Sequence, residues 1–370
     1  AVLGTLTAFI LRRPEHYRSF LRTGALVFGI AAALGTLIVI IGQFAPDTVS
    51  PAFSLLGSFD DQAFLMGLGV IGILITLRFL EIPQRARRFL IISGALALFL
   101  IAVANVSVVW VLIALVSLGL FVESVMARGT QGRDADFDDV SVLDEEQSFS
   151  DEGNRSLVLP LAVLAISLFF LIGGTLGGAL ANTLNVNVLN VRPSWQSTFG
   201  IAQKVYTSSP VFGTGPGTFG VEWLKYRDAS LNSTVFWNID FSSGIGFIPT
   251  SFVTTGLLGA LAWILFLGLI AVLGLRMIIL RAPEDSFIRY VSILSFIATI
   301  YLFTIAVFGL PNSIILVLAF VFAGIFISTA RFAAYGRQWG IIFSRSPRLG
   351  FVIVFVLTIL LLSSVVVAYT

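Results

Sequence analysis

The chain of 370 residues is 57% hydrophobic and only 11% charged, proportions that exclude an ordinary soluble domain and indicate a protein with many membrane spans. Its formal net charge is only +2 and its basic residues are dispersed between apolar segments, which argues against a nucleic-acid partner. The lack of cysteine excludes a disulfide framework and a thiolate nucleophile, and the single histidine, His16, excludes a multi-histidine metal site. We therefore expect no metal and no cofactor.

Apolar runs long enough to cross a bilayer recur along the chain. A transmembrane helix needs about 20 apolar residues, and the runs that meet this criterion are Thr23–Phe44, Gln62–Leu80, Phe89–Asn105, Ser107–Met126, Ser156–Gly178, Ser251–Leu275, Tyr290–Leu310, Asn312–Ala330 and Gly350–Tyr369. The shorter run Ala1–Leu11 is predicted to be the end of a further helix, so we expect the sequence to be part of a longer protein. The predicted fold is an all-α bundle of nine to ten spans.

The positions of lysine and arginine predict the orientation of these spans, because short loops retained in the cytoplasm are enriched in both. Counting spans places 18 of the 22 basic residues on one side, before the first complete span and in the turn after each even-numbered span. The other four lie together in the segment between the fifth and sixth spans, which is therefore predicted to be outside the cytoplasm; they are Arg192, Lys204, Lys225 and Arg227.

Two further connecting segments have distinct compositions. Ala127–Arg155 carries nine of the twenty acidic residues with almost no apolar periodicity, so we predict a disordered cytoplasmic linker, with a regulatory or partner-binding tail as the alternative. Ala45–Asp61 is predicted to be a short external cap. The expected organisation is N-terminal spans (1–126), acidic linker (127–155), one span (156–178), large external loop (179–250) and C-terminal spans (251–370).

The external loop is the part of the chain with the residues for chemistry. Pro193 suits the first turn of a helix, and apolar residues at helical spacing from Trp195 onward predict an amphipathic helix over 194–207 at the membrane surface. Arg192 stands at the entrance to this helix. Its guanidinium can serve a catalytic site, or it can extend to lipid headgroups, as interfacial arginines commonly do.

A glycine-rich turn follows Pro210. Gly213, Gly215 and Gly217 permit positive φ and close backbone approach, so their N–H groups are candidates for contacting an anion, and a tight turn that packs the loop onto the bundle is the alternative. The sequence 215–220 also has the spacing G-x-G-x-x-G. We reject a dinucleotide site because no strand–turn–helix unit surrounds it and Pro216 removes a donor.

Basic and acidic side chains near the end of the loop complete the candidates. Lys225, Tyr226 and Arg227 follow a second helix-like piece over 219–226, and arginine with lysine suits a diphosphate, with headgroup binding as the alternative. The loop's carboxylates are candidates for a general base or for salt-bridge partners; they are Glu222, Asp228 and Asp240.

Four motifs in this order resemble those of the O-antigen ligase and polymerase family of bacterial membrane glycosyltransferases. They are Arg192-Pro-Ser-Trp195, the run Pro210–Phe219, Tyr226-Arg227 and Thr255-Gly-Leu-Leu-Gly259. The resemblance implies a metal-independent, inverting transferase in the bacterial inner membrane, with its large loop in the periplasm. The implied partners are an undecaprenyl-diphosphate-linked glycan donor, a glycan or lipid acceptor, and membrane lipid.

The resemblance also implies roles for individual residues. Arg192 and Arg227 are the expected catalytic arginines at the diphosphate, and the expected substrate-binding residues are Trp195, Lys204, Gly213, Gly215, Gly217, Lys225 and Tyr226. The family places a histidine shortly before the Gly-Leu-hydrophobic-Gly signature. This chain has Asp240–Pro249 there, so Asp240 is the nearest substitute as a base. A transporter, a flippase, or a protein that binds the lipid-linked glycan without transfer is the alternative.

Overall fold

The computed structural model describes residues 2–11, 13–44, 53–134, 146–184, 186, 191–228, 238–280, 283–332 and seven positions between 351 and 362. All regular structure in these residues is helical, as predicted. The helices are α1 Val2–Ile10, α2 Pro14–Phe44, α3 Phe59–Phe79, α4 Gln84–Ala104, α5 Ser107–Asp134, α6 Glu146–Ile172, α7 Gly174–Thr183, α8 Trp195–Ser208, α9 Phe219–Tyr226, α10 Phe247–Leu275 with a π-helical extension Arg276–Leu280, α11 Ser286–Phe308 and α12 Ser313–Thr329.

Six of these helices are long and apolar enough to cross a membrane, which is fewer than the nine to ten spans predicted from sequence. They are α2, α3, α4, α5, α10 with its extension, and α11. The predicted span 156–178 is divided at Gly173, so its apolar part is the shorter stretch Leu157–Ile172 of α6, and α12 is also short. The predicted span 350–369 lies mostly outside the described residues. The described residues therefore confirm an all-helical bundle with apolar helices, and they leave the predicted number of spans unconfirmed.

The two connecting segments also differ from expectation. The helices α5 and α6 continue into the acidic segment predicted to be a disordered linker, which leaves 135–145 between them, outside the described residues. Of the predicted cap 45–61, residues 45–52 lie outside the described residues, and its last residues form the beginning of α3 at Phe59, with Ser58 as the N-cap. Ser58 Oγ accepts a hydrogen bond from Asp61 N at 3.0 Å, which satisfies one of the unpaired donors of the first turn.

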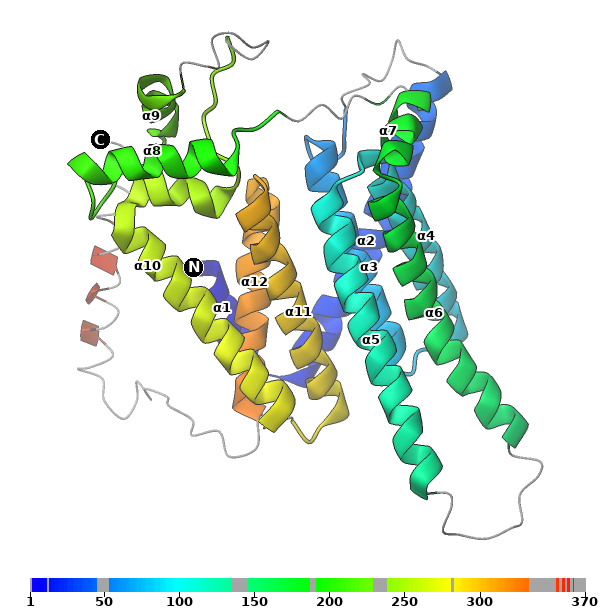
Figure 1. The fold of residues 1–370 in the computed structure, drawn as a ribbon. Helices are drawn as coiled ribbons and strands as arrows, with labels where there is room; N and C mark the ends of the chain where they lie inside the picture. The colour runs from blue at the N-terminus through cyan, green and yellow to red at the C-terminus, as the bar shows by residue number, and fades with distance from the viewer. Residues whose placement is uncertain are drawn as a thin grey trace.

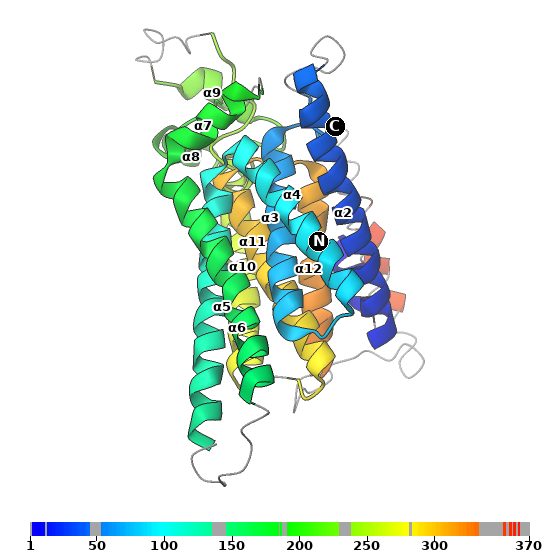
Figure 2. The same ribbon diagram turned by 90° about the vertical axis from the view of Figure 1, so that its right-hand side faces the viewer.

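The long helices run side by side, and two short ones lie across one end of the bundle. Helices α2 to α6 form one side and α1, α10, α11 and α12 the other, with α11 packed against both α12 and α3 (Figure 1). Both views place α8 and α9 at one end, opposite the beginning of α11 (Figures 1 and 2). The helices predicted over 194–207 and 219–226 are α8 and α9.

A break in α10 fixes this end of the molecule. Gly256 has φ 64° and ψ −160°, so the helix is interrupted there and its backbone groups lose their intrahelical partners. The glycine-rich turn supplies new partners: Thr214 N and Gly215 N donate to the carbonyls of 253 and 254 at 3.3 and 2.9 Å, and Leu257 N donates to Pro210 O at 2.9 Å. The turn and the break therefore complete each other's hydrogen bonding and attach the α8–α9 segment to the bundle.

Candidate functional site

The beginnings of α3 and α12 are joined by a hydrogen-bond network at the end of the bundle that carries α8. Asp61 Oδ1 accepts from Asn312 N at 2.8 Å, and Asn312 Nδ2 donates to Leu56 O at 3.0 Å. Asn312 is itself the N-cap of α12, since its Oδ1 accepts from Ile315 N at 3.1 Å. Asp61 is thus a structural residue that holds the first turn of α3, and with it Asp60, in one position.

Arg192 reaches across from the segment before α8 to this first turn of α3. Its Nη2 donates to Asp60 Oδ2 in an ion pair, and its Nη1 lies 3.5 Å from the carbonyl oxygen of Phe308 at the end of α11. The Arg192 and Asp60 side chains are only 17% and 12% exposed. The guanidinium is therefore directed into the protein, in contrast to the alternative in which it extends to lipid headgroups.

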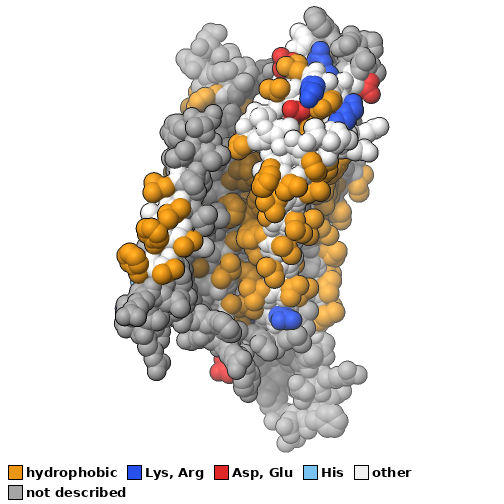
Figure 3. Space-filling model, turned by 90° about the vertical axis from the view of Figure 1, so that its left-hand side faces the viewer, with side chains coloured by type: hydrophobic (Ala, Val, Ile, Leu, Met, Phe, Trp, Pro, Cys, Tyr) orange, Lys and Arg blue, Asp and Glu red, His pale blue; other side chains and the backbone are white. Residues whose placement is uncertain are grey.

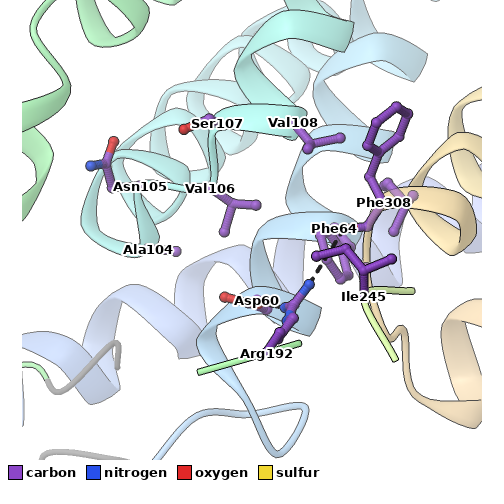
Figure 4. Close-up of a pocket in the computed structure, with 12 residues that line it drawn as sticks. Asp60, Phe64, Ala104, Asn105, Val106, Ser107, Val108, Arg192, Ile245 and Phe308 are labelled. Atoms are coloured by element: carbon purple, nitrogen blue, oxygen red, sulfur yellow. Dashed lines mark hydrogen bonds and ion pairs between the residues drawn. The ribbon is translucent and has the colours of Figure 1, made fainter. Parts of the chain in front are cut away.

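The ion pair borders a cavity of about 430 Å³. The first turn of α3, the α4–α5 connection, the end of α11 and the segment before α10 surround it (Figure 4). Its lining residues are Asp60, Phe64, Ala104, Asn105, Val106, Ser107, Val108, Arg192, Ile245, Ile305, Phe308 and Gly309. The volume lies in the range typical of small-molecule sites, and the lining combines apolar walls with a few polar groups, as such sites do.

The charge of this cavity differs from the sequence-based prediction. Of the residues that line it, Arg192 is basic and Asp60 is acidic, so the pair is neutral as a unit. Arg227 was predicted to be a second cation at the same diphosphate, but it is not among the lining residues and instead caps the end of α9. The described site is thus an arginine with an internal counter-ion, where the sequence predicted a cluster of cations.

The predicted substrate-binding lysines form a separate group on α8 and α9. Lys204 Nζ donates to Tyr226 O at 3.3 Å and lies 5.6 Å from the centre of the Tyr226 ring, and Lys225 Nζ lies 4.7 Å from the same ring. Lys204 is nine positions after Trp195, which corresponds to roughly 14 Å along the helix axis. Neither lysine lines the cavity. The structure therefore brings Lys204, Lys225 and Tyr226 together, but not with Arg192.

Trp195, at the beginning of α8, stays close to the cavity through an aromatic contact. Its ring is 5.5 Å from that of Phe308, a lining residue, and 5.8 Å from that of Phe199. The indole thus connects the first turn of α8 to the end of α11, beside Arg192.

The glycine-rich turn uses its backbone donors within the protein. Gly213 N donates to Ser209 O at 3.1 Å, and the amides of 214 and 215 bond to α10. A side chain at Gly213 would meet the carbonyl oxygen of Val253 at 2.5 Å, so the turn is packed directly on the helix break. For Gly213 and Gly215 this geometry fits the second interpretation, a tight turn packed onto the bundle, and not contact with an anion. Gly217 also has a positive φ.

The loop carboxylates lie apart from the cavity. Asp240 is exposed and precedes Phe241, whose ring packs on Trp223 of α9 at 4.9 Å, while Glu222 is buried on α9. In the segment 240–249 only Ile245 lines the cavity. Asp60 is therefore the carboxylate nearest to Arg192 in the described site, although it was not among the predicted site residues. The pattern Ser58-x-x-Asp61 before an apolar run is a helix-start signal that would have placed Asp60 in a first turn.

The fold and site together define an all-helical protein with six helices able to span a membrane and an arginine–aspartate pair beside a cavity at one end. Within the described residues, histidine, aspartate and glutamate side chains form no group of three that could hold a metal ion. Comparisons with protein-family models, with curated proteins and with solved structures find no match for this chain.

Proposed function

We propose that the protein is a membrane glycosyltransferase of the O-antigen ligase and polymerase kind, which moves a glycan from an undecaprenyl-diphosphate carrier to an acceptor hydroxyl. The observation that carries this proposal is the direction of Arg192, whose guanidinium faces a cavity in the protein and not the surface. Arginine binds phosphate oxygens through two parallel hydrogen bonds, and a cation already in place stabilises negative charge as it develops on the leaving group.

In this proposal the diphosphate takes the place of Asp60 on Arg192. Carboxylate and phosphate oxygens are both acceptors for the guanidinium fork, so the two anions compete for the same donors. Before the donor binds, Asp60 keeps a largely buried arginine paired, because an unpaired buried charge is costly. The arriving diphosphate carries the greater charge and releases the carboxylate into the cavity.

The released carboxylate supplies the base that the sequence lacks at the position of the family histidine. The acceptor oxygen forms a bond to the anomeric carbon, and the bond from that carbon to the diphosphate oxygen breaks. The acceptor proton passes to Asp60, and undecaprenyl diphosphate leaves as an anion held by Arg192. Asp60 replaces Asp240 in this role because Asp60 lines the cavity whereas Asp240 does not.

The proposal includes a location in the cell. The protein would lie in a bacterial inner membrane, with α6 and α12 adding to the six long spans and the end that carries α8 and α9 in the periplasm. The chain has no cysteine, so a single cysteine introduced at the exposed position Gln203 can be labelled selectively. Labelling of intact spheroplasts by a membrane-impermeant maleimide is expected, and labelling only after lysis would contradict the orientation.

A transfer assay tests the activity. The full chain, reconstituted in vesicles, is incubated with an undecaprenyl-diphosphate oligosaccharide and candidate acceptors without any nucleotide sugar. We expect the oligosaccharide to move to an acceptor, and Arg192→Ala to abolish this transfer. Arg289→Ala is the matched control, because Arg289 is exposed near the beginning of α11 and does not line the cavity. Equal activity of the Arg192→Ala and Arg289→Ala proteins would refute the proposal.

A second function, binding or translocation of the lipid-linked glycan without transfer, is favoured by one observation. The expected base, Asp240, lies away from the cavity, so transfer depends on Asp60 alone in the described site. The transfer assay separates the two functions. A protein that only binds the donor forms no product with any acceptor, in the wild type or in Arg192→Ala, and Arg192→Ala then lowers donor binding alone.

A further inference from the structure

The group formed by Lys204, Lys225 and Tyr226 lies outside the cavity and has a different environment. The two lysines come from different helices, and both ammonium groups approach the ring of Tyr226, at 5.6 Å and 4.7 Å from its centre. Both lysine side chains are exposed, whereas Glu222, one turn before Lys225, is only 8% exposed. The cations are thus presented outward, and the acid of the same helix is turned into the protein.

Exposed apolar side chains occur on α9, beside Lys225, and in the glycine-rich turn before it. Phe212 is 73% exposed, and Val221 and Leu224 of α9 are 63% and 54% exposed. Below them α10 presents a continuous exposed apolar face; its members are Leu257, Leu258, Leu261, Ile264, Leu265, Leu269 and Val272. On this face of the molecule basic side chains, with acidic ones among them, gather at one end above a broad apolar area, with a paler zone of other side chains and backbone between (Figure 3).

The apolar, aromatic and basic side chains follow one another in the same order as the layers of a membrane surface. Exposed leucine and isoleucine on α10 suit the hydrocarbon core, aromatic rings and long basic side chains suit the headgroup level, and α8 lies across the bundle end at that level (Figure 1). The pairing with Tyr226 also raises the pKa of Lys225 above its usual value, through their hydrogen bond and then through charge. Lys225 therefore stays charged at neutral pH.

We propose that Lys204, Lys225 and Tyr226 form a binding site for the headgroup of an anionic phospholipid. The two ammonium groups, which both approach one ring, match a phosphodiester that carries a single negative charge, and the exposed Leu224, next to Lys225 on α9, suits an acyl chain. Lipid is the favoured source of the phosphate because α8 and α9, which carry the site, pack against α10, whose apolar face is exposed. This inference is independent of the glycosyltransferase proposal, since none of these side chains lines the cavity.

Native mass spectrometry of the full chain in a neutral detergent tests the site. Phosphatidylglycerol and phosphatidylcholine are titrated separately, and we expect the phosphatidylglycerol to bind more tightly. Lys204→Gln with Lys225→Gln should weaken the binding of phosphatidylglycerol by roughly 25-fold, about fivefold for each basic residue near a lipid surface, and should leave phosphatidylcholine unchanged.

Three controls define the outcomes. Lys204→Arg with Lys225→Arg keeps the charges and should keep the preference, and Gln203→Ala changes an exposed neutral neighbour on α8 and should have no effect. Inorganic phosphate at millimolar concentration should not displace the lipid. Three results would each overturn the proposal. They are an unchanged preference for phosphatidylglycerol in Lys204→Gln with Lys225→Gln, an equal loss of phosphatidylglycerol binding in Gln203→Ala, and displacement of the lipid by inorganic phosphate. Equal melting temperatures of these proteins in neutral detergent show that they fold alike.

Discussion

The joint between the glycine-rich turn and the break in α10 permits a quantitative prediction for Gly256→Ala. Gly256 combines φ 64° with ψ −160°, a region that is almost exclusive to glycine and that costs another residue about 1–3 kcal/mol. The added Cβ would also meet the carbonyl oxygen of Val211 at 2.6 Å, a backbone atom that cannot rotate away. We therefore expect the substitution to open the joint and to leave the rest of α10 in place.

Hydrogen exchange of the joint amides measures this opening. The amides of 214, 215, 257 and 258 bond across the joint, so their exchange should become roughly 5- to 150-fold faster, the equivalent of about 1–3 kcal/mol. Gly268→Ala is the matched control: it lies in the same helix, its Cβ would meet nothing within 4 Å, and alanine favours a helix interior by about 0.5–1 kcal/mol. Unchanged protection in Gly256→Ala, or equal loss in Gly268→Ala, would refute this account of the joint.

Two further predictions concern contacts that hold the bundle together. Arg78 Nε and Nη2 donate to the two carboxylate oxygens of Glu123 at 2.7 and 3.0 Å. Thermal unfolding of Arg78→Ala, Glu123→Ala and the double variant should give a coupling free energy of up to about 1 kcal/mol. Additive losses of stability would show that the pair contributes nothing. Asn312→Ala removes the N-cap of α12 and should cost about 1–2 kcal/mol in the same assay. Ser313→Ala, at the exposed neighbouring position, should cost much less, and equal costs would contradict the capping role.

Local patterns in the sequence predicted local structure well. The apolar spacing from Trp195 and over 219–226 gave the two short helices α8 and α9, because such spacing reflects which face of a helix is buried. Arg192 was singled out because it is one of few cations in its segment, and the structure places it beside the cavity. These predictions depended on neighbours within a few turns of the chain.

The remaining features depend on contacts between distant segments. Arg192 and Asp60 are 132 positions apart, so nothing in the local sequence indicates that a carboxylate neutralises the arginine. Lys204 and Lys225 were grouped with Arg192 because they share one loop, but α9 folds back on α8 and separates them from the cavity. The break at Gly256 lies inside the predicted span Ser251–Leu275 and was not predicted, since a sequence motif does not show which backbone groups the glycine-rich turn will satisfy.

The central claim is that a diphosphate replaces Asp60 as the partner of Arg192, and the affinity of the donor measures this exchange directly. A short-chain prenyl-diphosphate oligosaccharide is titrated into the wild type, Asp60→Asn and Arg192→Ala in detergent. A charge-assisted hydrogen bond contributes about 1.5–3 kcal/mol, so Asp60→Asn, which removes the competing carboxylate, should tighten donor binding by roughly 10- to 150-fold. The same variant should lose transfer, and Arg192→Ala should weaken donor binding. Weaker binding by Asp60→Asn, or wild-type binding by Arg192→Ala, would contradict the account.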